Sequence, residues 1–144
     1  MTYKINTNHN ADICEDLVAL DIRKKGWVTL QPSCRDTPYD LVVDINGAFH
    51  SVQVKKLSGK KNNGLVKRLE RGNQKVTQNG KVRNTIDYAE EGIDYLVGVN
   101  VETEEIFYYS YATYSQIPAK KFSVDRHPPD DFPVNTGIKK NTDY

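Results

Sequence analysis

The sequence predicts an α/β (α+β) fold in which a mixed β-sheet is flanked by helices. Three observations support it: a helical pattern comes first, a strand and a hairpin follow, and two more strands come after a long basic segment. The 144 residues fit one domain, which can bury a core without disulfide bonds. We therefore expect a single domain over 1–144, with a basic insertion over 57–85 and an irregular tail over 123–144.

The first predicted element is a helix from about Asn10 to Lys25. Asn8 and Asn10 are candidate N-caps, and Gly26 follows two lysines as a C-terminal signal. Glu15 lies in an apolar stripe of this helix, although glutamate is seldom buried unless it is paired. It is either a half-exposed residue at the edge of the stripe or a carboxylate that points over the sheet. The apolar members of the stripe are Ala11, Val18, Ala19 and Ile22.

The next predicted elements are a strand over Gly26–Pro32 and a β-hairpin over Pro38–Lys56. The Asn46–Gly47 pair favours a two-residue type I′ turn, because both residue types tolerate positive φ. That turn pairs Leu41 with Val52 and sends alternate residues to opposite faces. One face is then apolar and is predicted to lie on the core. Its members are Leu41, Val43, Ile45, Ala48, Val52 and Val54.

The opposite face of the hairpin gathers polar side chains at one end. In the same register Asp40 faces Gln53, and Lys55 follows on the same face. Asp40 and Lys55 can form a surface ion pair worth at most about 1 kcal/mol. Alternatively, oxygens of Asp40 and Gln53 bind a hard cation while Lys55 stabilises charge on a phosphate. A Glu15 carboxylate directed toward Asp40 favours the second interpretation, because a metal would compensate the crowding of two acids.

Two more strands are predicted at about Asp94–Val101 and Glu105–Tyr111, and the tail from about Ser123 is rich in proline and polar residues. No apolar run approaches the roughly 18 residues of a membrane span. The N-terminus lacks the apolar core of a signal peptide. Cys14 and Cys34 form no zinc-binding spacing and are interpreted as reduced thiols. We expect an intracellular, cytoplasmic protein without a membrane partner.

Charge is unevenly distributed along the chain. The net charge is +1, but the segment Lys55–Arg83 holds ten basic residues and one acid, Glu70, so the rest of the chain is negative. This asymmetry indicates a polyanionic partner, with nucleic acid as the first candidate. A solvated loop is the alternative, and charge alone does not distinguish DNA from RNA. A second Asn-Gly pair, Asn79–Gly80, predicts a short basic hairpin or ribbon in this segment.

Together and in this order, these motifs resemble the PD-(D/E)xK nucleases, and more closely their group I intron-associated homing endonucleases. The matching segments are "ADICEDLVALDIRKKGW", "TPYDLVVDINGAFHSVQVKK" and "GIDYLVGVNVETEEIFYY". The resemblance extends from about Asn10 to Tyr111, most of the chain. It implies a restriction-endonuclease-like core that carries the basic segment as a DNA-reading insertion.

The resemblance also implies a catalytic set, which consists of Glu15, Asp40, Gln53 and Lys55. Metal ligands for Mg²⁺ (or Mn²⁺) would come from Asp40, Gln53, Glu15 and the backbone carbonyl of Val54. Gln53 departs from the usual Asp or Glu and brings a neutral oxygen, so metal affinity should fall. The homing branch is similar in carrying glutamine here, so we expect an active enzyme.

The function implied is Mg²⁺-dependent, site-specific cleavage of double-stranded DNA. The alternatives are a Holliday-junction resolvase, a restriction-type nuclease, or an inactive DNA-binding module. One motif per chain gives one active site, so we expect a homo-oligomer, either a dimer or a dimer of dimers (tetramer). The segment "IFYYSYATY" is a candidate contact between subunits, with a packed edge strand as the alternative. Predicted DNA-binding residues are Lys56, Lys60, Lys61, Lys67, Arg68, Arg71, Gln74, Lys75, Gln78, Lys81 and Arg83.

Overall fold

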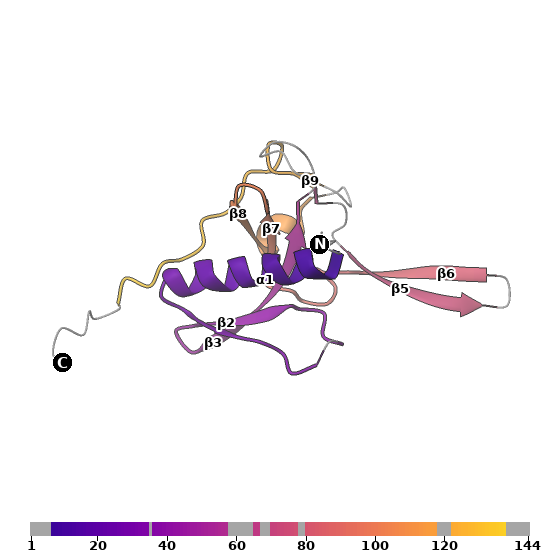
Figure 1. The fold of residues 1–144 in the computed structure, drawn as a ribbon, viewed down its shortest axis with the longest axis horizontal. Coiled ribbons are helices and arrows are strands. Elements are labelled where there is room, and N and C mark those ends of the chain that lie inside the picture. The colour runs from indigo at the N-terminus through magenta and orange to yellow at the C-terminus, as the bar shows by residue number, and fades with distance from the viewer. Residues whose placement is uncertain are drawn as a thin grey trace, which may run out of the picture.

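The computed structural model describes residues 7–34, 36–57, 65–66, 70–77, 80–117 and 122–137. Its centre is a five-stranded mixed sheet with helix α1 (Thr7–Lys24) across one face (Figure 1). Neighbouring strands are antiparallel except β3 and β7, which run parallel. This confirms the predicted α/β architecture. In spatial order the strands are β1 (Val28–Leu30), β2 (Leu41–Ile45), β3 (Ala48–Lys56), β7 (Tyr95–Val99) and β8 (Ile106–Ser110).

Helix α1 begins earlier than the sequence predicts. It starts at Thr7, so Asn8 and Asn10 lie inside the helix and the prediction that they cap it is wrong. The C-terminal prediction is confirmed: Gly26 has φ of 92° and its N–H donates to the Arg23 carbonyl at 2.9 Å. The buried face of α1 packs on the sheet through Cys14, Val18, Ala19 and Ile22.

The hairpin of β2 and β3 has the predicted register. Leu41 pairs with Val52, and the turn residues Asn46 and Gly47 have φ of 54° and 86°, as a type I′ turn requires. The Asp44 carboxylate accepts a hydrogen bond of 2.8 Å from the Gly47 N–H. The predicted core face is buried at Leu41, Val43, Val52 and Val54 and half-buried at Ile45, whereas Ala48 is exposed beside the turn.

The sheet separates two apolar clusters. The first lies under α1 and contains the buried residues of β2 and the helix. The second lies on the opposite face and consists of Leu57, Tyr88, Ile93, Leu96, Tyr109 and Tyr114. Gly98 on β7 makes room for Leu57, because a Cβ there would lie 2.9 Å from the Leu57 Cδ2 atom. The polar face of the hairpin therefore borders an aromatic cluster that the hairpin pattern alone does not reveal.

A long two-stranded ribbon extends from this core (Figure 1). It is formed by β5 (Glu70–Thr77) and β6 (Gly80–Asp87), which are antiparallel throughout, so the predicted basic ribbon is confirmed. Thr77 pairs with Gly80, which makes Gly80 the first residue of β6. The remaining elements are β4 (Leu65–Val66), its antiparallel partner β9 (Phe122–Ser123), and the short helix α2 (Tyr111–Tyr114).

Residues 124–137 contain no helix or named strand, yet they are attached to the core. Asp130 forms an isolated bridge with Tyr108, and the Phe132 ring is buried with its centroid 4.5 Å from that of Tyr108. The Trp27 indole N–H donates to the Pro133 carbonyl at 2.7 Å. This part of the chain thus closes one side of the core instead of only lying on the surface. Among the described residues, no helix is long and apolar enough to cross a membrane.

Candidate active site

Asp40 is fixed against β3 by two hydrogen bonds. It directly precedes β2, and its N–H donates to the Val52 carbonyl at 2.8 Å. Its carboxylate Oδ2 accepts from the Val54 N–H, also at 2.8 Å. These contacts bracket Gln53, the residue that the hairpin register places opposite Asp40. The carboxylate is therefore held in one position by backbone groups before any ligand arrives.

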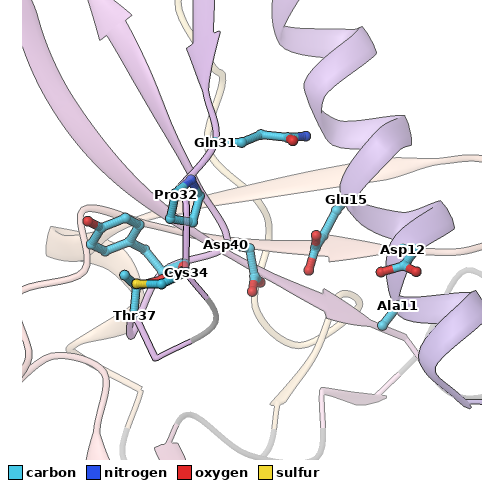
Figure 2. A pocket seen from close by; sticks show the side chains of 9 residues that line it. Ala11, Asp12, Glu15, Gln31, Pro32, Cys34, Thr37 and Asp40 are labelled. Carbon is cyan, nitrogen blue, oxygen red and sulfur yellow. Dashed lines mark hydrogen bonds between the residues drawn. The ribbon is translucent and has the colours of Figure 1, made fainter.

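Glu15 reaches the same place from α1. Figure 2 shows the carboxyl groups of Glu15 and Asp40 turned toward one another across the gap between helix and strand. Burial, followed by the negative charges of Asp40 and Asp12, raises the pKa of Glu15 to about 7. Burial also raises the pKa of Asp40, opposed by the Val54 N–H and the positive charge of Lys55. Near neutral pH the two groups therefore tend to share one proton.

The other predicted residues lie beside this pair. The Gln53 amide Nε2 donates to the Val54 carbonyl at 3.4 Å, so the two candidate ligands are adjacent. Lys55 lies close enough to Asp40 to affect its pKa, and its Nζ is 5.0 Å from the centroid of the Tyr88 ring. The structure thus brings together all the predicted site residues, namely Glu15, Asp40, Gln53, Val54 and Lys55.

A pocket of about 390 Å³ opens beside the two carboxyl groups (Figure 2). Part of its wall comes from the irregular segment between β1 and β2. The end of this segment belongs to the quoted motif "TPYD", whereas Gln31 and Pro32 were predicted to lie in a strand. Asp12 was not predicted as a site residue, although it precedes Glu15 by three residues and so lies on the same side of the helix. The lining residues are Ala11, Asp12, Glu15, Gln31, Pro32, Cys34, Thr37, Tyr39 and Asp40.

The donor set fits a hard divalent cation. Within the described part of the chain, no group of three or more His, Cys, Asp and Glu residues is arranged to hold a metal. The site instead offers two carboxylates, the Gln53 amide and the Val54 carbonyl, all of which supply oxygen. Burial, followed by the negative charge of Asp40, raises the pKa of Glu15 and so disfavours its ionised form. A bound cation would remove that penalty.

The predicted DNA-binding residues fall into three groups. Lys56 is exposed at the end of β3. The backbone of five others is described in the ribbon, where Gln74 pairs directly with Arg83; the five are Arg71, Gln74, Lys75, Lys81 and Arg83. The rest lie outside the described residues, and these are Lys60, Lys61, Lys67, Arg68 and Gln78. Contact with DNA therefore stays a prediction for the whole set.

Comparison with known proteins gives two findings. The family model of the PD-(D/E)XK endonucleases matches residues 5–122. Among solved structures, the bacterial homing endonuclease I-Ssp6803I has a similar fold, with a TM-score of 0.65 over 94% of this chain and 84% of that chain. Sequence identity to it is 21%, so this likeness concerns the fold. A search of curated proteins finds no match.

Proposed function

The chain belongs to the PD-(D/E)XK endonuclease family, and on this premise we propose that it is a site-specific, homing-type endonuclease of double-stranded DNA. Hydrolysis of the phosphodiester bond would use Mg²⁺ (or Mn²⁺). The observation that carries the proposal is the meeting of the Glu15 and Asp40 carboxyl groups beside Gln53 and Lys55. Four residue types suited to one chemistry converge there from a helix and a hairpin.

Each side chain has a role in this proposal. Asp40, Glu15, Gln53 and the Val54 carbonyl would hold the cation, which when bound offsets phosphate charge and lowers the pKa of a water. Asp40 needs little reorganisation because Val52 and Val54 already fix it. Lys55 stabilises the negative charge that develops on the phosphate. With Gln53 neutral, the site supplies one negative charge fewer than the usual set, which favours weaker metal binding.

We assign DNA binding to the ribbon of β5 and β6 and to the other basic residues of the segment that contains it. A two-stranded ribbon has dimensions that the major groove admits, and Gln and Arg are suited to reading base edges there. Gln74 and Arg83 are directly paired in the ribbon, which supports their assignment to one reading position. The lysines of the segment would mainly contact phosphates and make binding salt-dependent.

Cleavage of both strands requires two active sites, so we propose that the functional unit is a homo-oligomer, a dimer or a dimer of dimers. The tyrosine-rich segment offers little exposed aromatic surface for this contact. Tyr108, Tyr109 and Tyr114 are buried in the core of the chain itself, and β8 is an edge strand of the sheet. Tyr111, with 47% of its surface exposed, is the tyrosine of this segment that stays available.

The deciding experiment is a cleavage assay on a duplex library in Mg²⁺ and in EDTA, with wild type and Asp40→Ala. We expect cutting at one site that is lost in EDTA and in the variant, while the variant still binds DNA. Cutting of four-way junctions without sequence preference would identify a resolvase instead. Retention of a specific duplex without cleavage in any metal would identify a DNA-binding module and refute the proposal.

A further inference from the structure

The ammonium group of Lys55 lies over an aromatic ring. Its Nζ is 5.0 Å from the centroid of the Tyr88 ring, within the range of a cation–π interaction. On the neighbouring strand β7 the residue paired with Lys55 is Gly98, which brings no side chain beside it. Tyr88 is 2% exposed, so its ring is a fixed surface and not a mobile surface group.

Tyr88 is anchored by contacts of its own. It belongs to the cluster on the face of the sheet opposite α1, together with Leu57 and Ile93. Its carbonyl accepts a hydrogen bond from the Ile93 N–H at 3.1 Å. The preceding residue, Asp87, accepts one from the Ala89 N–H at 2.8 Å through its carboxylate. Asp87 is also the last residue of β6, so the ring lies where the ribbon joins the core.

We propose that Tyr88 is a positioning residue for Lys55: its ring holds the ammonium group in place for the reaction. The inference rests on the proposed function, because it assigns Lys55 to phosphate chemistry. A lysine carries its charge on a flexible four-carbon stem and loses considerable freedom when it must act at one point. A buried ring below the ammonium group restricts that freedom before substrate binds. Alignment of a reacting group to within about 1 Å can change a rate by roughly 10²-fold.

The first test needs no catalysis. Protons attached to the Lys55 Cε atom should be shielded by the ring current of Tyr88, so their NMR signal should lie upfield of that of the exposed Lys56. Lys55→Arg assigns the signal in a lysine-labelled sample. The upfield position should persist in Tyr88→Phe, which keeps the ring, and be lost in Tyr88→Met, which fills the space without one. If the Cε protons of Lys55 and Lys56 have identical chemical shifts in the wild-type protein, the inference is wrong, and no Tyr88 variant is needed to show it.

The second test is kinetic and uses single-turnover cleavage at saturating DNA and metal. We expect Tyr88→Met to slow cleavage by about tenfold or more while the DNA dissociation constant stays within about twofold. Tyr88→Phe should restore the rate, because the ring face that attracts the cation remains. The matched control is Tyr114→Leu, which removes an equally buried ring from the same cluster. This control should cut at close to the wild-type rate under conditions where it is folded.

The outcomes separate this inference from the proposed function. If wild type cuts no duplex in any metal, the proposed function fails, and the NMR test still decides whether Tyr88 holds Lys55. If wild type cuts and folded Tyr88→Met cuts at the same rate, the inference alone is wrong. Equal rate losses in Tyr88→Met and Tyr114→Leu would likewise overturn it, because the effect would then come from general loosening of the cluster.

Discussion

The carboxyl groups of Glu15 on helix α1 and Asp40 before strand β2 line one pocket, although the two residues are 25 positions apart in the chain. The helix packs on one face of the sheet, and Asp40 is bound to β3 through the Val54 N–H. Two separate elements thus force two acids into one place. That arrangement costs free energy unless a proton or a cation lies between them.

The first prediction concerns the stability of the metal-free protein as a function of pH. Glu15 has a pKa of about 7 in the folded chain, against an ordinary value of 4.5. A pKa raised by folding stabilises the folded state fully below the unfolded pKa, and this contribution is lost as pH rises through about 7. Relative to Glu15→Gln, wild type in EDTA should therefore lose Tm between about pH 5 and pH 8. Parallel Tm profiles, measured by scanning fluorimetry, would contradict the shared proton.

The second prediction concerns metal affinity. Gln53→Glu adds a carboxylate to the ligand set and should tighten Mg²⁺ binding by about tenfold or more, because ligand charge tunes affinity for hard cations. Isothermal titration calorimetry measures it. Gln116→Glu, which adds the same charge at an exposed position, is the matched control and should leave affinity unchanged. Equal Mg²⁺ affinity in wild type and Gln53→Glu would show that Gln53 is not a metal ligand.

The third prediction separates the two adjacent lysines of β3. Lys55→Ala should still bind DNA but cut at least about 10²-fold more slowly, because it removes a charge that acts on the transition state. Lys56 alternates to the other face of the strand and is exposed. Lys56→Ala should weaken binding modestly and leave the rate at saturating DNA unchanged. Filter binding and single-turnover cleavage measure both; cutting by Lys55→Ala at the wild-type rate would refute its catalytic role.

The parts of the fold that follow from local chemistry were predictable. The Asn46–Gly47 turn determines the register of the hairpin from only a few neighbouring residues. That register places Gln53 and Lys55 on one face of the hairpin. Gly26 likewise ends α1 through its own positive φ. The start of α1 was predicted wrongly because asparagine is a favoured N-cap residue, whereas here Asn8 and Asn10 lie inside the helix.

The parts that depend on distant contacts were not predictable. Phe132 follows a proline-rich stretch with no periodic pattern, yet it is buried against Tyr95 and Tyr108. The position of Tyr88 near the site could not be predicted either, because Lys55, whose ammonium group lies over its ring, is 33 residues earlier in the chain. Gln31 reaches the pocket from an irregular segment, where sequence spacing does not determine direction.

The fourth prediction concerns sequence recognition by the ribbon. Arg83→Ala should weaken binding to the target duplex by about 1–3 kcal/mol, and binding to unrelated DNA by much less, because loss of a base contact removes discrimination. Competition binding at fixed salt measures both affinities. Lys56→Ala is the matched control and should weaken the two equally, as expected for a phosphate contact. If Arg83→Ala affects both duplexes equally, Arg83 does not read bases.

The fifth prediction concerns the C-terminal segment. Phe132→Ala should lower the free energy of unfolding by about 3–5 kcal/mol, as for other buried phenylalanines. Val134, which is 59% exposed, supplies the control: Val134→Ala should stay within about 0.5 kcal/mol of wild type. Urea denaturation measures both. A small effect at Phe132 would show that the segment leaves the core in solution.

The direct passage of β6 into the core at Tyr88 has a geometric consequence. A strand of eight residues at about 3.4 Å each extends roughly 27 Å. If the ribbon reads bases as proposed, its length would set the distance between the recognised base pairs and the bond that is cut. No linker lies between the last ribbon residue and the residue beneath Lys55. Shortening or lengthening the ribbon by one residue pair should therefore shift the cut relative to the recognised bases. In the proposed function, the number of residues in the ribbon would therefore determine the cutting position.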